Sequence, residues 1–282
     1  MDLGLRFDDR LLILGSSGWF GREIQELLAR SGFPGRVLAQ PGPSSGRAVL
    51  EEELRIFDPT VVVNFAFLTR ERVDVEGESE FRRINSELTE RFLRLADLPA
   101  VRLAITVSSG AAVTEPEHPY GELKAAEESA ALDLVSPSRA VVVLRTYSVS
   151  GAHVRRPRSY AFSDFILQAQ TGRLRIGADQ PVYRRYVNIQ DALKVSLRSG
   201  TTGASGIVET GGELLEMGDL AARIVSIVNP SAEVTRAEQT SDEPSIYGSD
   251  NLSWDEWVVN SGVDPLDLDE QIAAVAQGLI DD

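Results

Sequence analysis

A serine, a tyrosine and a lysine in the middle of the chain have the types and spacing for acid–base chemistry. Tyr120 and Lys124 are four residues apart in a segment with helical spacing, so their side chains share one face of the helix. An ammonium group one turn from a phenol favours the phenolate and lowers the pKa of the phenol from about 10. Ser109 follows the apolar run 101–107, which predicts a strand, and its hydroxyl could hold a substrate oxygen beside the phenol. We therefore expect Tyr120 to transfer a proton to or from a substrate oxygen.

A glycine-punctuated turn near the N-terminus has the spacing of a dinucleotide-binding site. The apolar run 11–14 leads into Gly15, Gly18 and Gly21, and the amphipathic run 22–30 follows. The first glycine allows a sharp turn, the second lets backbone N–H groups approach a pyrophosphate, and the third lets the helix pack closely. The helix N-terminus also favours anionic phosphates. A plain turn of an α/β protein is the alternative, but the strand before and the helix after favour the dinucleotide site.

Apolar runs alternate with amphipathic segments over about the first 150 residues. Strands are predicted over residues 11–14, 37–40, 60–67, 101–107 and 139–144. Helices are predicted over residues 22–30, 51–57, 79–95 and 120–132. This alternation is typical of an α/β fold with a doubly wound parallel sheet that helices cover on both faces.

Composition narrows the classes of function. With 282 residues, the chain can bury a large core as one domain or as one domain with a smaller lobe. Its net charge of −15 argues against a nucleic-acid partner. It has no cysteine and only two histidines, His118 and His153, so we expect no metal site. The sequence shows no signal peptide and no apolar run of membrane-spanning length, which predicts a cytoplasmic protein without a membrane partner.

The segment 151–185 is strongly basic although the protein is acidic. It has seven arginines and only two acidic residues, a local excess of five positive charges. The arginines are Arg155, Arg156, Arg158, Arg173, Arg175, Arg184 and Arg185. This excess predicts a site for an anionic ligand, and the alternative is a set of solvated surface arginines that pair with acids elsewhere.

The second predicted strand bears on the choice of cofactor. In a Rossmann unit an acid at the end of this strand binds the ribose hydroxyls of NAD, and a nearby basic residue can accept the phosphate of NADP. Here the strand ends at Gln40 with no acid beside it, and Ser44, Ser45 and Arg47 follow in a loop rich in Pro, Gly and Ser. This pattern favours NADP slightly over NAD, unless the loop is only a connection.

Several motifs together resemble the extended short-chain dehydrogenase/reductase family, in its NAD-dependent epimerase/dehydratase group. The motifs are GSSGWFG at 15–21, NFAF at 64–67, Asn85, SSGAAV at 108–113, YGELK at 120–124, LRTYSVSG at 144–151 and YRRYVNIQD at 183–191. The resemblance covers nearly the whole chain and implies a Rossmann-type sheet with a smaller C-terminal substrate lobe. It implies a dinucleotide-binding domain over 1–150 and a substrate lobe over most of 151–282, with 186–228 returning to the Rossmann domain.

The resemblance also assigns roles to residues. It implies that Ser109, Tyr120 and Lys124 form the catalytic trio and that Ser109, Ser148 and Arg184 contact the substrate. The expected cofactor-binding residues are Gly15, Ser17, Gly18, Trp19, Phe20, Gly21, Gln40, Phe65, Ala66, Phe67, Asn85, Tyr120 and Lys124. The implied cofactor is NAD or NADP, the implied substrate is a nucleotide-linked sugar, and a homodimer is one assembly that the resemblance allows.

The sequence departs from the family pattern at four places. Gly110 and Ala111 follow Ser109 where dehydratases have an acidic pair, which disfavours dehydration. Val113 replaces a tyrosine, and the connection 110–119 is short. Thr240 stands near where UDP-sugar epimerases place an arginine that binds the diphosphate, so UDP recognition is not expected to follow their pattern.

Three functions remain open from the sequence. The first is an NAD(P)-dependent enzyme of a nucleotide-linked sugar, with ketoreduction slightly favoured over epimerisation. The second is a reductase of a non-sugar carbonyl compound. The third is a catalytically silent NADP-sensing regulator, which the intact trio disfavours.

Overall fold

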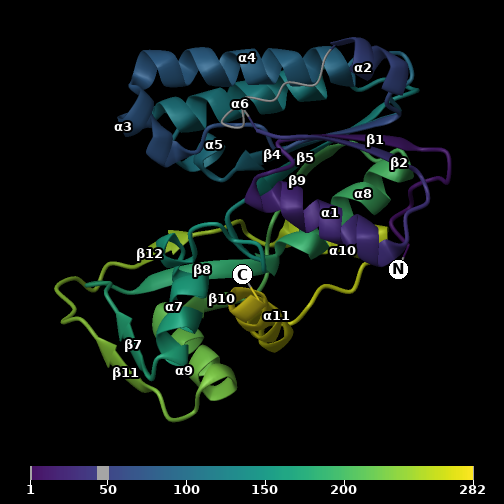
Figure 1. Cartoon of the computed structure of the whole chain (residues 1–282). Coiled ribbons are helices and arrows are strands. Elements are labelled where there is room, and N and C mark those ends of the chain that lie inside the picture. Colours follow the sequence, from purple (N-terminus) through teal and green to yellow (C-terminus); the bar gives the residue numbers. More distant parts are fainter. Residues whose placement is uncertain (1, 43–50, 282) are drawn as a thin grey trace.

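Six parallel strands form the central sheet of the protein, shown in the computed structural model in Figure 1. The structure describes residues 2–42 and 51–281. The order across the sheet is β2-β1-β3-β4-β5-β9. The strands are β1 (Arg10–Leu14), β2 (Arg36–Gln40), β3 (Val61–Asn64), β4 (Leu103–Ser109), β5 (Ala140–Thr146) and β9 (Gly206–Glu209). The α/β class and the parallel sheet predicted from the sequence are confirmed.

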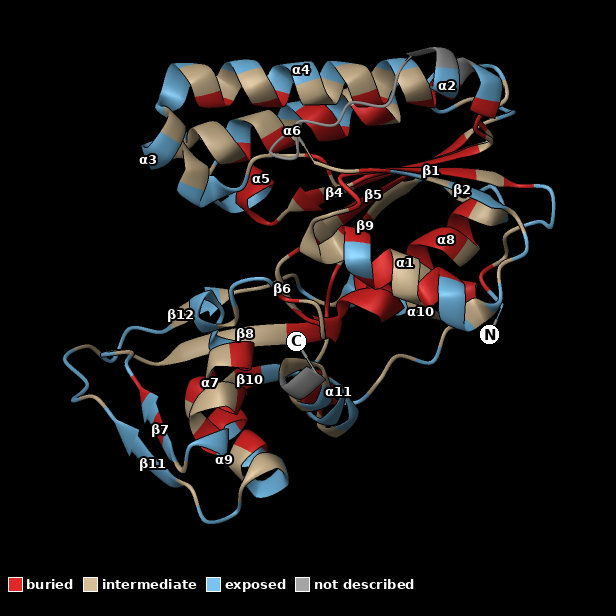
Figure 2. Ribbon diagram, in the orientation of Figure 1, coloured by how far each residue is buried: buried red, intermediate tan, exposed pale blue. Residues whose placement is uncertain are grey.

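Helices cover both faces of this sheet because its buried side chains alternate in direction along each strand. Leu12 and Leu14 of β1 belong to one apolar cluster, whereas Leu11 and Ile13 belong to the other. The first face is covered by α2 (Glu51–Phe57), α4 (Glu78–Ala96) and α6 (Pro119–Leu132), and the second by α1 (Trp19–Ser31), α8 (Ile189–Thr201) and α10 (Leu252–Ser261). Figure 2 shows the resulting band of buried residues between the helix layers.

The crevice of the sheet lies at the carboxyl ends of β1 and β3. In the register of the sheet, Leu14 is level with Gln40 on one side and with Asn64 on the other. From β1 the chain goes first to the edge strand β2 and then returns to β3 on the opposite side. Ligands of open α/β sheets bind at such a change of direction.

One predicted strand is longer than the corresponding strand in the structure. The run 60–67 was predicted as a strand, but β3 ends at Asn64. The Asn64 Oδ1 accepts a hydrogen bond from the backbone N–H of Ala66 over 3.1 Å, which turns the chain out of the sheet. Phe65, Ala66 and Phe67 therefore lie beyond the end of the strand.

The remaining chain builds a smaller lobe with its own apolar core. Its strands are β6 (Ser148–Ser150), β7 (Arg173–Ile176), β8 (Val182–Asn188), β10 (Leu214–Glu216), β11 (Glu233–Arg236) and β12 (Ser245–Tyr247). Its helices are η3 (Pro157–Ser159), α7 (Ala161–Gln170), α9 (Met217–Val228) and α11 (Leu268–Asp281). Three short helices, η2 (Arg70–Arg72), α3 (Val73–Glu76) and α5 (Ala111–Thr114), lie in the connections of the Rossmann part.

The structure divides the segment 186–228, which the sequence assigned to the Rossmann domain. The helix α8 and the strand β9 do join that part, but β10 and α9 do not. Leu220 and Ile224 of α9 are fully buried against α7 and α11 in the core of the lobe. Conversely, α10 packs against α8 through Trp254, although the sequence placed it in the lobe.

Among the described helices, none combines the length and the apolar character that crossing a membrane requires.

The first glycine of the turn generates a stability prediction. Gly15 has a φ of +79°, and a Cβ there would lie 2.7 Å from the backbone nitrogen of Ala66. Gly32 is also left-handed, with a φ of +67°, but has open space around it. We expect Gly32→Ala to lower the free energy of unfolding by about 1–2 kcal/mol, and Gly15→Ala to lower it by about 1–3 kcal/mol more because of the added clash.

Chemical denaturation of both variants measures this difference. If both variants lose the same free energy of unfolding, Gly15 is not packed tightly against the residues after β3.

Candidate active site

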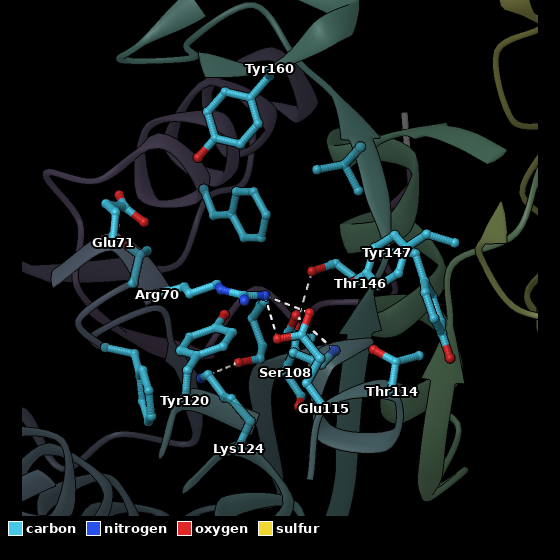
Figure 3. Close-up of a pocket in the computed structure, with 18 of the residues that line it drawn as sticks. Arg70, Glu71, Ser108, Thr114, Glu115, Tyr120, Lys124, Thr146, Tyr147 and Tyr160 are labelled. Carbon is cyan, nitrogen blue, oxygen red and sulfur yellow. Dashed lines mark hydrogen bonds and ion pairs between the residues drawn. The ribbon is translucent and has the colours of Figure 1, made fainter. Parts of the chain in front are cut away.

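A cavity of about 780 Å³ opens between the carboxyl ends of the sheet and the lobe (Figure 3). Of the residues predicted from the sequence, those that line it are Gly18, Trp19, Phe20, Phe65, Phe67, Ser109, Tyr120, Lys124 and Arg184. These residues come from α1, the connection after β3, the end of β4, the start of α6, and β8. The cavity thus joins the glycine turn, the predicted trio and one of the arginines.

The start of α6 fixes the place of Tyr120. Pro119 is the first helical residue, where its missing N–H and fixed φ suit a helix start. His118 caps the helix, because its Nδ1 accepts a hydrogen bond from the backbone N–H of Tyr120 over 3.1 Å. The ring of Tyr120 packs edge-on against Phe67, with ring centres 5.9 Å apart.

Lys124 lies one turn further along α6 and is only 4% exposed. Its Nζ donates to the carbonyl oxygen of Val107 over 2.7 Å and to Glu127 Oε2 over 2.9 Å. The same ammonium lies 3.6 Å from the ring centre of Phe67, a cation–π contact. Lys124 is therefore held on three sides by the protein.

Glu127 is a buried residue of the site that the sequence analysis missed. Its side chain is 1% exposed. Its Oε1 accepts from the Asn64 amide over 2.9 Å and from the Thr106 hydroxyl over 2.5 Å, while its Oε2 binds Lys124. The spacing of three residues between Lys124 and Glu127 on one helix was the available signal.

The structure corrects the expectation that Lys124 lowers the pKa of Tyr120. Burial raises the pKa of the Tyr120 phenol well above its ordinary value. The nearby Ser109 hydroxyl lowers the pKa in part, whereas Tyr247, Glu127 and Tyr160 raise it further. The Lys124 ammonium forms an ion pair with Glu127, whose carboxylate contributes to the raised pKa of the phenol.

The glycine turn and the start of α1 have the features that a dinucleotide needs. Gly18 caps α1 with no side-chain hydrogen bond, and no acidic residue lies in the first turn of the helix. A Cβ on Gly21 would lie 2.4 Å from the carbonyl oxygen of Gly15, so the third glycine lets the helix start close to the turn. The N-terminus of α1 is thus open to an anionic group.

Gln40 lies at the predicted ribose position and carries an unpaired buried atom. Its side chain is 4% exposed, and its Oε1 has no hydrogen-bond partner in the described part of the chain. The neighbouring Ser17 Oγ accepts from the backbone N–H of Gly42 over 3.2 Å. Ser44, Ser45 and Arg47, which favoured NADP in the sequence, lie outside the described residues.

Two other predicted cofactor residues lie behind the cavity wall. Asn85 is fully buried, and its Oδ1 accepts from the backbone N–H of Leu68 over 2.7 Å. Ala66 is held by Asn64, as described above. Both contacts hold the connection after β3, which carries Phe65 and Phe67 into the cavity.

Of the seven arginines in the basic segment, Arg184 is the one that lines the cavity. Its guanidinium donates to the carbonyl oxygens of Tyr183 and Ser245, over 2.7 and 3.0 Å, and these uncharged partners do not offset its charge. Arg185 instead binds the carbonyl oxygens of Ser249 and Gly212. The others lie on η3, on its flanking residues and on β7, so the basic segment is spread over the lobe rather than gathered at one site.

Ser148 does not line the cavity in the structure. It lies on β6, where it pairs with Tyr186 of β8. Its neighbours Tyr147 and Val149 do line the cavity.

The lobe and the loops contribute further residues that the sequence did not predict. Tyr247 of β12 lines the cavity, and its phenol oxygen lies close to Gly110. Figure 3 shows Arg70 pointing toward Glu115, with which it forms an ion pair at the cavity wall. No local pattern could have identified Tyr247, because the pairing of β12 with β8 brings it there from a distant part of the chain.

Glu23, Glu26 and His153 form a cluster beside α1 whose ligand atoms lie within 4.8 Å of one another. These atoms are engaged in hydrogen bonds within the protein. Glu23 Oε1 accepts from the Trp19 indole and from the backbone N–H of His153, each over 2.9 Å. The cluster therefore connects Trp19, which lines the cavity, to His153 in the segment after β6.

Solved structures with a similar fold cover almost the whole chain. The UDP-N-acetylglucosamine 4-epimerase from Methanobrevibacter ruminantium M1, in complex with UDP-N-acetylmuramic acid, has 17% identity and a TM-score of 0.77, over 97% of this chain and 99% of that one. The UDP-glucose 4-epimerase from Brucella ovis, in complex with NAD, has 19% identity and a TM-score of 0.74, over 95% and 98%. The GDP-mannoheptose C4 reductase from Campylobacter jejuni, with NADP bound, has 14% identity and a TM-score of 0.73, over 98% and 99%. At these identities the similarity is one of fold.

A search among curated proteins finds no matching sequence. The model of the NAD dependent epimerase/dehydratase family matches residues 11–209, which is more than two thirds of the chain. That span contains the glycine turn, Ser109, Tyr120, Lys124 and Arg184. The chain therefore belongs to the NAD dependent epimerase/dehydratase family.

Proposed function

We propose that the protein is an NAD(P)-dependent oxidoreductase of a nucleotide-linked sugar and that it acts as a ketoreductase in preference to an epimerase. The observation that carries this proposal is the common cavity of the glycine turn and of Ser109, Tyr120 and Lys124. The Brucella ovis and Campylobacter jejuni enzymes of similar fold are complexes with NAD and NADP. The open N-terminus of α1 and the unpaired Oε1 of Gln40 fit such a dinucleotide.

The bound dinucleotide would supply or accept a hydride. The residues of the chain would handle the oxygen of the reacting carbon. The Ser109 hydroxyl would hold that oxygen, and Tyr120 would donate a proton to it in reduction or take one from it in oxidation. Lys124 would donate to the ribose, and its place one turn after Tyr120 on α6 puts the two side chains on the same face of the helix.

The electrostatics of the cavity favour the reductive direction. A reductase needs a phenol that carries its proton at the start of the reaction, whereas an epimerase first removes a proton from a hydroxyl. Burial raises the pKa of the Tyr120 phenol and the Glu127 carboxylate adds to the rise, which is consistent with a phenol that starts the reaction with its proton. Gly110 and Ala111 offer no carboxylate beside Ser109, which is consistent with reduction rather than dehydration.

Arg184 is the proposed contact for the substrate diphosphate. Lys124 and Arg70 are each paired with a carboxylate, Glu127 and Glu115 respectively. Arg184 binds uncharged oxygens, so its charge remains available at the lobe side of the cavity. A charge-assisted hydrogen bond to phosphate is worth about 1.5–3 kcal/mol. Ser148, also proposed as a substrate contact, would need a substrate that extends beyond the cavity lining.

Replacing Tyr120 by Phe tests the proposed function. The change removes one oxygen and keeps the ring that packs on Phe67, so we expect the fold and cofactor binding to be retained. Hydride transfer to a demonstrated substrate should fall by at least about 10²-fold, the lower end for general acid–base catalysis. Tyr183→Phe, the same change outside the cavity lining, is the control. A hydride-transfer rate within threefold of the unmodified protein would place the chemistry elsewhere or favour a silent NADP sensor.

Replacing Glu127 by Gln tests the electrostatic part of the proposal. Since Glu127 raises the pKa of Tyr120, its loss should lower the pKa that appears in the pH profile of kcat/KM. Reduction needs the protonated phenol, so it should be lost at a lower pH than in the unmodified protein, and oxidation should appear at a lower pH. Glu128→Gln is the matched control, because the Glu128 carboxylate binds Arg145 and does not line the cavity. Identical pH profiles for the two variants would exclude the role of Glu127.

Direct titration of both reduced cofactors, by nucleotide fluorescence, tests the preference for NADP without any substrate. We expect NADPH to bind more tightly than NADH, because no acid at Gln40 repels the additional phosphate. Gln40→Glu should weaken NADPH by about tenfold relative to NADH, or about 1.4 kcal/mol. Gln40→Met, which adds no charge, is the control. Binding of NADH more than tenfold tighter than NADPH by the unmodified protein contradicts the preference.

A further inference from the structure

One aromatic side chain of the lobe packs on the glycine turn of the Rossmann part. The rings of Tyr160 and Trp19 have their centres 5.3 Å apart, with an angle of 59° between their planes. Both residues line the cavity. Trp19 is the first residue of α1, directly after the N-cap Gly18, whereas Tyr160 precedes α7 in the lobe. The two parts of the protein therefore meet at the helix N-terminus where the dinucleotide is proposed to bind.

The indole of Trp19 is held firmly in this position. Its Nε1 donates to Glu23 Oε1 over 2.9 Å, and Glu23 is only 1% exposed. Glu23 Oε2 in turn accepts from Gln190 Nε2 over 2.9 Å. A Cβ on Gly151 would lie 2.4 Å from Glu23 Oε1 and 2.7 Å from Trp19 Nε1, so the chain is tightly packed around the indole. Trp19 thus gives Tyr160 a fixed surface to pack against.

Tyr160 itself keeps part of its surface available to a ligand. It is 42% exposed and lines the cavity, although its ring packs on Trp19. Figure 3 shows Tyr160 well apart from Tyr120, across the cavity. A ligand that covers exposed aromatic surface removes it from water, which is favourable. The position of Tyr160 suits a ligand at the N-terminus of α1 rather than the reacting carbon at Tyr120.

A second contact joins the same segment of the lobe to the Rossmann part. Arg156 Nη1 lies 3.7 Å from Glu71 Oε1, and Glu71 also lines the cavity. Both side chains of this ion pair are more than half exposed, and such pairs contribute little to stability. The ring contact of Tyr160 with Trp19 is therefore the stronger of the two links.

We propose that Tyr160 is a cofactor-binding residue supplied by the lobe, and that its ring, supported by Trp19, covers the dinucleotide at the N-terminus of α1 and slows its release. This inference rests on the proposed binding of NAD(P) at that terminus. The lobe then contributes to cofactor affinity, although the glycine turn belongs to the Rossmann part. The contact depends on the ring and not on the hydroxyl, so Tyr160→Phe should retain it.

The rate of NADPH release tests the proposal without any substrate. Rapid mixing of the NADPH complex with excess NADP, followed by the fluorescence of NADPH, gives the dissociation rate. We expect Tyr160→Ala to raise this rate about three- to tenfold, the range for the loss of one aromatic contact, and to leave the association rate unchanged. Tyr160→Phe should release NADPH as slowly as the unmodified protein. An unchanged dissociation rate in Tyr160→Ala overturns the proposal.

Tyr183→Ala is the matched control, because it removes a tyrosine of the lobe that does not line the cavity. It should change neither rate. An equal rise of the association and dissociation rates in Tyr160→Ala would make the ring a barrier to entry rather than a contact, and the proposal fails. It also fails if Tyr160→Phe releases NADPH as fast as Tyr160→Ala, because the contact would then lie at the hydroxyl. If Tyr160→Ala does not fold, Tyr160→Leu replaces it, since this change also removes the ring and keeps apolar packing.

A measurement at equilibrium tests which ligand covers the ring. In protein labelled with ¹³C at the tyrosine Cζ, the Tyr160 signal is the one that is absent from Tyr160→Phe. We expect this signal to move when NADPH alone is added, whereas the Tyr183 signal should not move. An unmoved Tyr160 signal in protein saturated with NADPH overturns the proposal. If neither NADPH nor NADH binds the unmodified protein, the proposed function itself fails; if NADPH binds and Tyr160→Ala releases it at the unmodified rate, only this inference fails.

Discussion

The site depends on one buried ion pair, between Lys124 and Glu127 on α6. Moving a charged group out of water costs several kcal/mol unless partners satisfy it. Glu127 meets this cost with hydrogen bonds from Asn64 of β3 and Thr106 of β4, and Lys124 with the carbonyl of Val107. Since these partners belong to two neighbouring strands, the ion pair holds α6 against β3 and β4. This contact brings Tyr120, at the start of α6, to the cavity at the end of β4, where Ser109 lies.

The same pair shapes the charge distribution of the cavity. Burial is the largest effect on the pKa of Tyr120 and raises it, and the carboxylate of Glu127 adds to the rise. The Arg70 guanidinium is likewise offset by Glu115. Arg184 differs, because it binds neutral oxygens. The cavity therefore combines a neutral proton donor at the sheet with an available positive charge at the lobe, which suits a substrate whose reacting carbon and anionic group lie some distance apart.

Local sequence patterns predicted what local interactions determine. Periodicity located the five predicted strands and four predicted helices of the first 150 residues to within a few positions, but the short elements at 70–76, 111–114 and 148–150 were not predicted. The strand β3 was overextended because an Asn64 side-chain contact ends it. The spacing of Tyr120 and Lys124 predicted a shared helix face. It did not predict the pKa direction, because that depends on burial and on Glu127, whose role follows from packing against β3 and β4. The position of α9 was likewise decided by contacts with α7 and α11 rather than by its own amphipathic pattern.

Composition alone predicted a larger site for an anionic ligand than the arginines of the lobe form in the structure. Seven arginines in a short stretch suggested one basic surface, but alternate residues of a strand face opposite sides, and successive elements run in different directions. Arg184 and Arg185 are adjacent in the sequence, yet one lines the cavity and the other binds the backbone of the segments after β9 and β12. The lobe nevertheless reaches the cavity at another point, where the phenol oxygen of Tyr247 lies close to Gly110. A Cβ at position 110 would lie 2.8 Å from that oxygen and 2.4 Å from the ring of Tyr147, so a larger residue there would force these side chains of the cavity wall to shift.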